Sequence, residues 1–173
     1  MKKSFGIVVA IMAAGILIGA SITVKSVAAG EKARDGSFVA NDNGTVLDTK
    51  TKLMWADKDN GKTVKWLDAN SYCESYRGGG YTDWRMPTVD ELTSLYDETK
   101  SYTADNGKTV HLTKLIHLTS FVVWTSETSG LTTMNNPSNT ATSRIFIFYN
   151  GKKPLIRSSN FTDSCALPVR STK

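Results

Sequence analysis

The sequence predicts one α+β domain, in which two helices pack on twisted antiparallel strands that are connected by long loops. Two segments carry apolar residues at helical spacing, one on each side of the glycine run at residues 78–80. Short β-rich segments lie before and after them, separated by Asn, Gly and Pro turn signals. Helices that cover one face of an antiparallel sheet give the layered architecture of the α+β class.

The first 29 residues are expected to lie outside this domain. Lys2 and Lys3 precede an apolar run from Phe5 to Val24, and Ser26-Val-Ala-Ala29 offers small residues that suit a signal peptidase. The run is also long enough to span a bilayer, so an uncleaved membrane anchor is the alternative. Either segment places the rest of the chain outside the cytoplasm.

Short strands are expected at the start of the domain, which we place at residues 38–173 after a polar lead at residues 30–37. Phe38–Ala40 and Thr45–Asp48 are predicted strands around the turn signal Asn43-Gly44. Leu53–Ala56 is a third.

Two helices follow these strands. Apolar residues recur on one face from Trp66 to Tyr76, which predicts a helix that ends at Gly78 and turns Cys73 toward the core. Thr88 and Glu91 have the spacing of a capping box, and Pro87 ends the preceding extended segment, so a second helix is expected from Val89 to Tyr96.

The second half of the chain is expected to contribute strands and loops. Residues 97–108 and 125–143 read as loops by composition, and Phe121–Trp124 between them as a central strand. Asn150-Gly151 predicts a hairpin turn, with its strands at residues 144–149 and 154–157. Leu167–Arg170 is expected to close the sheet.

The charge of the chain gives no argument for nucleic-acid binding. Three of the 21 basic residues precede residue 30, which leaves 18 against 16 acidic residues, and no Lys/Arg run appears. A local patch at Lys152, Lys153 and Arg157 could attract an acidic glycan, and Asn136 lies in the loop expected beside it. The alternative for this patch is a solvated hairpin face.

Two motifs identify a family. Asn43-Gly-Thr-Val-Leu-Asp-Thr-Lys-Thr-Lys-Leu-Met-Trp-Ala56 and Gly79-Gly-Tyr-Thr-Asp-Trp-Arg-Met-Pro-Thr88 together resemble the C-terminal domain of the Legionella collagen-like adhesin, over about residues 38–170. The Arg85–Leu92 segment is also similar to a helix start in formylglycine-generating enzymes. These resemblances imply a C-type-lectin-like fold, and the first implies a bacterial envelope or secreted protein. A shared fold does not by itself carry a shared function.

The two cysteines, Cys73 and Cys165, lie in the part expected to be exported, where oxidising conditions favour pairing. We therefore predict a disulfide between them. The alternative is two reduced, buried thiols.

Catalytic and metal chemistry finds little support in the sequence. Asp57, Asp59, Asn60 and Gly61 do not have EF-hand spacing, and His111 and His117 match no helical metal spacing. No G-x-S-x-G motif is present, and the cysteine pair of formylglycine-generating enzymes is reduced to Cys165. We expect no cofactor, no metal and no enzyme activity.

The tryptophans and Arg85 are expected to be structural. Trp55, Trp66, Trp84 and Trp124 each sit in an apolar pattern that predicts core packing, with sugar stacking as the alternative. Arg85 is expected to form a buried bidentate pair with a carboxylate of Asp83, Asp90 or Glu91. The helix start made of Trp84, Arg85, Pro87, Thr88 and Glu91 is thus expected to be a frame.

The function expected from these observations is an extracytoplasmic binding or adhesion module for a glycan or an envelope or host protein. A membrane would be contacted only through an uncleaved first segment. The alternatives are a membrane-tethered structural subunit of an envelope complex and an enzyme on the formylglycine-generating scaffold.

Overall fold

The computed structural model describes residues 30–129, 141–158 and 161–172. Within them it contains two α helices and antiparallel sheets, which confirms the α+β class; the lectin-like fold stays a prediction. The bounds are β1 Glu31–Asp35, β2 Phe38–Asn41, β3 Thr45–Asp48, β4 Leu53–Ala56, α1 Trp66–Ser75, α2 Val89–Leu95, β5 Tyr102–Thr103, β6 Thr109–Val110, β7 Val122–Ser129, β8 Thr142–Ile147, β9 Leu155–Arg157 and β10 Val169–Ser171.

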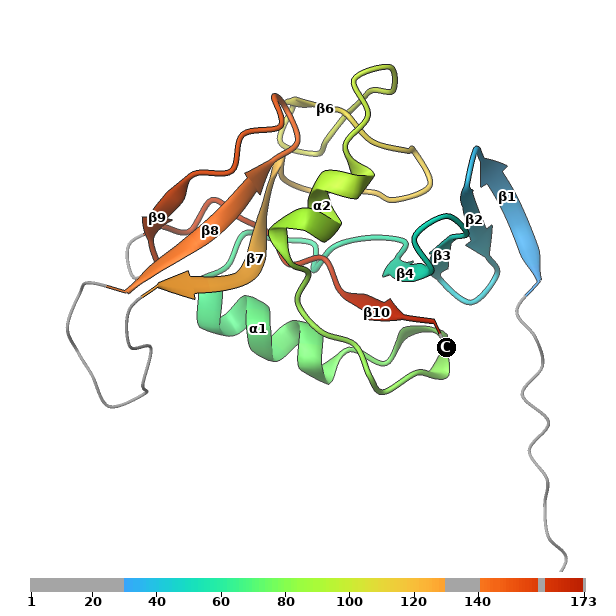
Figure 1. Cartoon of the computed structure of the whole chain (residues 1–173), viewed down its shortest axis with the longest axis horizontal. Helices are drawn as coiled ribbons and strands as arrows, with labels where there is room; N and C mark the ends of the chain where they lie inside the picture. The colour runs from blue at the N-terminus through green and yellow to red at the C-terminus, as the bar shows by residue number, and fades with distance from the viewer. Residues whose placement is uncertain (1–29, 130–140, 159–160, 173) are drawn as a thin grey trace, which may run out of the picture.

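A five-stranded antiparallel sheet has the order β1-β2-β3-β4-β10, so the first strands of the domain pair with its last (Figure 1). The expected strands β2, β3 and β4 are present, with Gly44 in the left-handed region at φ 77°. The polar lead was an incomplete prediction, because Glu31–Asp35 pairs with β2. Charged, exposed side chains keep an edge strand such as β1 soluble.

Helix α1 buries Ala69 and Cys73 and ends at Ser75, with Tyr76 as its C-cap, before the predicted stop at Gly78. Residues 78–80 instead form a 3₁₀ turn, inside which Gly79 has φ 65°. A Cβ atom on Gly79 would lie 2.7 Å from the methyl group of Thr45. The close approach of this turn to β3 therefore requires glycine there.

Helix α2 begins as the sequence predicts. The Thr88 hydroxyl accepts from the Glu91 amide at 3.2 Å, and the Glu91 carboxylate accepts from the Thr88 amide at 2.8 Å, which completes the capping box. The expected loop after α2 was partly wrong, because Tyr102–Thr103 pairs with Thr109–Val110 in a two-stranded sheet.

A second antiparallel sheet has the order β7-β8-β9. The expected loop at residues 125–143 was wrong in its described ends, because β7 continues to Ser129 and β8 begins at Thr142. An irregularity in the pairing between Trp124 and Thr128 interrupts the alternation of β7, and Thr125 and Ser143 are buried. The predicted turn at Asn150-Gly151 joins β8 to β9.

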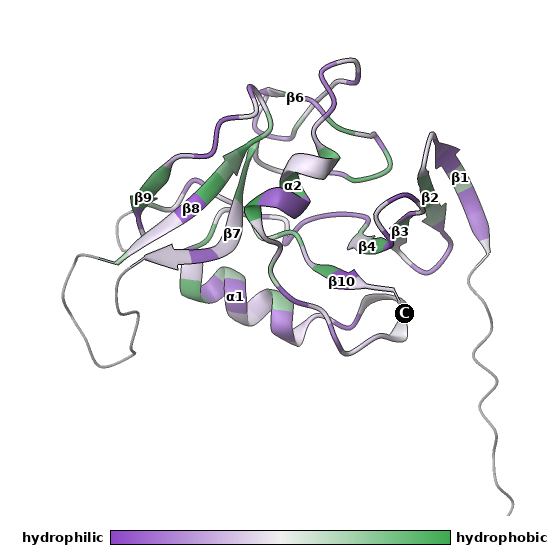
Figure 2. Cartoon of the chain, in the orientation of Figure 1, coloured by the Kyte–Doolittle hydropathy of each residue, from purple (hydrophilic) through white to green (hydrophobic). Residues whose placement is uncertain are grey.

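The core consists of two clusters. The larger packs β2, β3 and β4 with α2, Phe146 and the C-terminal segment, and the smaller lies between α1 and the β7–β8 strands. Figure 2 shows apolar stretches on β2, on β8 and on the part of β7 farther from its arrowhead, and both apolar and hydrophilic stretches along the loops. No helix in the described part of the chain has the length and apolar character needed to cross a membrane.

Candidate ligand-binding surface

The Asp83–Thr88 block is a junction between α2 and two sheets. Arg85 donates to Glu91 through two hydrogen bonds, of 2.7 and 2.5 Å, so Glu91 is the carboxylate that it binds. The Arg85 side chain is 41% exposed, and the pair is therefore half-buried where a buried pair was expected. The backbone of Arg85 also bridges to Val169 of β10. Asp83 instead binds Arg170, at 2.6 and 3.0 Å.

The Glu91 carboxylate is held in its charged form. Burial alone would raise the pKa of Glu91, but the hydrogen bonds from Arg85 and Thr88 outweigh burial and hold this pKa below its usual range. The same pair raises the pKa of Arg85. The helix start thus contains a fixed ion pair.

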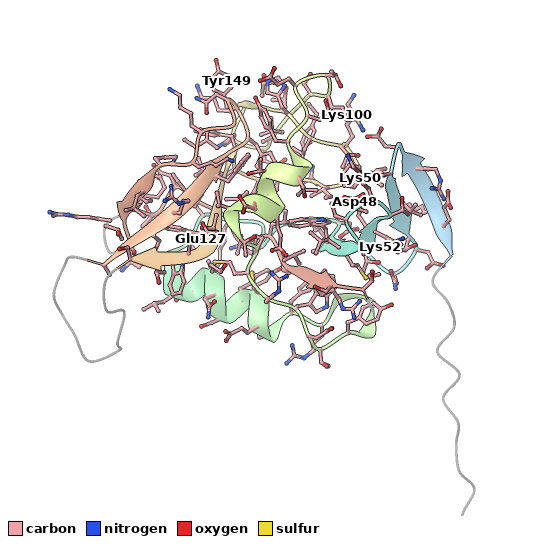
Figure 3. The ribbon with its side chains drawn as sticks, viewed as in Figure 1. Asp48, Lys50, Lys52, Lys100, Glu127 and Tyr149 are labelled. Carbon is pink, nitrogen blue, oxygen red and sulfur yellow. The ribbon has the colours of Figure 1, made fainter. Side chains whose placement is uncertain are left out.

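Glu127 is a further residue of this junction, which the sequence did not reveal. It lies on β7, and its carboxylate accepts from the amide of Val89, the first residue of α2, at 2.8 Å. Figure 3 shows Glu127 beside the start of α2. The second oxygen of the carboxylate lies 3.7 Å from Arg144 Nε on β8. Glu127 therefore fastens the helix start to the second sheet.

Three tryptophans are core residues, as predicted. Trp55, Trp84 and Trp124 are at most 3% exposed, and the last two donate their indole N–H to the carbonyls of Gly78 and Val64. Trp66 is half-buried and donates to the carbonyl of Thr125. The buried Trp55 N–H finds no hydrogen-bond partner in the described residues.

The predicted ligand residues of the hairpin lie on β9 and in the turn before it. In the register of β8 and β9, Arg144 stands opposite Leu155 and Thr142 opposite Arg157. Arg157 shares a sheet face with Arg144 and Leu155, whereas Lys152 stands opposite Ile147 and so lies toward the other face. Glu127 lies in the irregular part of β7, and its carboxylate is 3.7 Å from Arg144 Nε. We call the set Thr142, Arg144, Lys152, Lys153, Leu155 and Arg157 the hairpin surface. Lys152 and Arg157 are exposed and Lys153 is half-buried, whereas Asn136 lies outside the described residues.

The hairpin surface is cationic with an exposed apolar centre. Leu155, in the middle of this surface, is 48% exposed. Arg144 is fixed by a 2.8 Å hydrogen bond from its Nη1 to the carbonyl of Lys153. The nearby carboxylate of Glu127 accepts a hydrogen bond from the Val89 amide. The positive charge of this surface favours anionic over cationic partners.

A polar cleft lies beside Lys100, between β1–β3 and the loops after α2. Two cavities of about 520 and 720 Å³ share Lys100 in their lining. Its ammonium group is 2.7 Å from the carboxylate of Asp35 and 5.6 Å from the centre of the Phe38 ring. Lys114 lines one cavity and Lys50 the other (Figure 3), and neither forms an ion pair in the described part.

The acidic residues of this cleft are already engaged. The hydrogen bond from Lys100 holds the pKa of Asp35 below its usual range. Asp48 is 2% exposed, and burial would raise its pKa, but hydrogen bonds from Thr51, Ser37 and backbone amides lower it overall. Asp97 and Glu98 also line the cleft and accept hydrogen bonds from Thr99 and from the Tyr96 hydroxyl. Lys50 and Lys114 are lysines of the cleft that form no ion pair in the described residues.

The predicted disulfide is corrected by the structure, which holds Cys73 and Cys165 as free, buried thiols. They belong to different core clusters: Cys73 packs under α1, and Cys165 directs its thiol to the carbonyls of Ser120 and Val122. Burial raises the pKa of Cys73 to about 12, and burial followed by the nearby Asp59 raises the pKa of Cys165 well above its usual value. Both thiols are therefore protonated at neutral pH.

The polar turn at residues 57–61 is an internal connector. Asp59 is 4% exposed as a residue. Its carboxylate accepts hydrogen bonds from the amide of Gly61 and from the amide and hydroxyl of Thr119. Asn60 accepts from the amide of Ala166 at 2.8 Å. In the described residues no group of three or more His, Cys, Asp or Glu side chains is placed to hold a metal ion.

Comparison with known proteins gives one family. No curated protein matches the chain. The Lcl C-terminal domain family matches residues 44–169, which include the 43–56 motif from Gly44 onward, the Asp83–Thr88 block and both cysteines. The match spans most of the described structure, from β3 to the first residue of β10. The chain therefore belongs to the Lcl C-terminal domain family, and it is an adhesin-related module.

Proposed function

We propose that this domain is a non-enzymatic binding module that acts outside the cytoplasm and binds an anionic glycan through the hairpin surface. The observation that carries the proposal is the set of cations on β8, β9 and their turn, whose acidic neighbour Glu127 is engaged by α2. A sulfated or carboxylated chain can contact these cations from the solvent side. The family also favours an external partner and an extracellular or surface location.

The state of the cysteines supports a non-enzymatic role. Formylglycine-generating enzymes use a close pair of cysteines, whereas Cys165 is buried, and its pKa is raised well above the usual value of a thiol. A protonated, enclosed thiol is a poor nucleophile. We therefore propose that the domain serves binding.

The test is binding of the purified domain to an array of glycosaminoglycans at two salt concentrations. The variant Lys152→Ala/Lys153→Ala/Arg157→Ala should lose most of the binding and most of its salt dependence, because exposed cations attract polyanions through screened charge. The matched control is Lys58→Ala/Lys62→Ala/Lys65→Ala, which removes the same charge from exposed positions before α1 and should bind like wild type.

A second pair of variants separates the hairpin surface from the cleft. Lys50→Ala/Lys114→Ala removes two cleft lysines that form no ion pair in the described residues and leaves the hairpin intact. Loss of binding in this variant, with full binding in the hairpin variant, would move the site to the cleft. Absence of saturable binding by wild type, with co-purifying envelope proteins, would instead favour a structural subunit.

A further inference from the structure

The backbone amide of Gly30 contacts a carboxylate at the point where the folded domain begins. Gly30 N donates to Asp42 Oδ1 at 3.0 Å, and Asp42 N donates to the carbonyl of Gly30 at 2.9 Å. Asp42 belongs to the turn after β2, and Gly30 directly precedes β1. Both ends of the Gly30 peptide are thus fixed by one residue.

The sequence independently marks the same bond. Val27-Ala28-Ala29 has small residues at the third and first positions before Gly30, as a signal peptidase requires. Gly30 itself is exposed, so this end of the described domain lies at its surface. Hydrolysis of this bond adds water, leaves a carboxylate on Ala29 and turns the Gly30 amide nitrogen into an ammonium group.

We propose that Gly30 is the first residue of the mature protein and that the ammonium group created there is held by the carboxylate of Asp42. Cleavage then converts a neutral hydrogen bond into a charge-assisted one at the same pair of atoms. The new amino terminus becomes an anchoring point for β1, which is an edge strand.

The neighbouring residues leave this pairing open. On β1, the side chain of Glu31 is taken by two hydrogen bonds from Arg34, at 3.0 and 2.7 Å, so Arg34 does not compete for Asp42. Lys32 is the other charge beside Gly30 along the strand, and it forms no ion pair in the described part. A Cβ atom at residue 30 would lie 3.0 Å from Asp42 Oδ2, so glycine gives the carboxylate the closest access.

The first experiment is to express the full chain in an exporting bacterium and to measure the intact mass and the first peptide of the exported protein. The expected result is a chain that starts at Gly30. Retention of Met1, or a start at another residue, would overturn the proposal.

The second experiment measures the ionic contact itself. The pKa of the Gly30 amino group is followed in the exported protein by the pH dependence of its Cα resonance. Asp42→Asn should lower this pKa by about 0.2 to 0.7, the shift that corresponds to a solvent-exposed ion pair. Asp90→Asn removes the same charge on α2 and should leave it unchanged. Equal values in wild type and Asp42→Asn would show that the new terminus is free.

Discussion

Arg85 illustrates how a half-exposed side chain can still determine a helix start. Its two hydrogen bonds reach Glu91, which is only 16% exposed and would lose its cationic partner in Arg85→Ala. Because Arg85 is 41% exposed, solvent screening reduces the effect from that of a buried pair to about 1 to 2 kcal/mol of unfolding free energy. Thr88→Ala should cost about 1 kcal/mol through the lost cap. Urea unfolding measures both.

The pH dependence of the Arg85→Ala variant follows from the lowered pKa of Glu91. A carboxylate with a folded pKa below its unfolded value stabilises the fold above the unfolded pKa, about 4.3, and loses this contribution as pH falls through the folded value. The stability gap between wild type and Arg85→Ala should thus be full at pH 7 and shrink below about pH 4. Asp90→Ala, in the first turn of the same helix, is the control. A gap that does not change with pH would contradict this assignment.

The two thiols give a prediction that separates the structure from the disulfide expected on sequence grounds. Native protein at pH 7 to 8 should resist alkylation by iodoacetamide, because both cysteines are buried and the pKa of Cys73 is raised to about 12. After unfolding without a reductant, both should react, and mass spectrometry should count two adducts. A crosslinked Cys73–Cys165 peptide in a non-reducing digest would restore the original prediction.

Helix α2 depends on β7 as well as on its own sequence. Glu127→Ala removes the acceptor of the Val89 amide and should cost about 1 to 2 kcal/mol, because a polar group at the helix start then loses its partner. Glu127→Gln keeps an acceptor oxygen and should cost less than the alanine variant. Thr128→Ala, at the exposed neighbour on β7, should be close to neutral. Thermal unfolding of the three variants is the measurement.

Elements with local signals could be predicted from the sequence, and those with distant partners could not. The start of α2 was predictable because Thr88 and Glu91 are three residues apart, whereas Glu127 binds Val89 across 38 positions. Strand β1 was not predicted, because an exposed, charged edge strand lacks the alternation of apolar and polar residues by which strands are recognised. The second half of β7 was likewise not predicted, because the irregular pairing after Trp124 interrupts the alternation of its side chains.

The candidate site was predictable only in part for the same reason. Lys152, Lys153 and Arg157 are close in sequence, so their local charge was visible. Arg144 joins them only through strand pairing, and the cleft collects Lys50, Lys100 and Lys114 from three separate segments. The pairing of the cysteines likewise depends on where the chain carries them, which composition and compartment do not determine.

The whole molecule is connected at the turn of residues 57–61. Asp59 accepts from Gly61 and Thr119, and so joins the segment after β4 to the segment before β7. Asp59→Ala should cost about 3 kcal/mol or more, because several donors in a site that is 4% exposed lose their acceptor together. Asp57→Ala, whose side chain forms no hydrogen bond in the described residues, should cost much less. Comparable losses in the two variants would argue against Asp59 as the connector.

The pairing of β4 with β10 has a consequence for the order in which this chain can fold. Leu53 faces Ser171, so the first sheet is complete only when the C-terminal end of the chain is present. Pairings between distant positions form slowly, and a ribosome delivers the N-terminal strands first. During synthesis β1 to β4 are therefore made before β10, the strand that completes their sheet. The first sheet thus reaches its full width only after the last residues of the domain have been made.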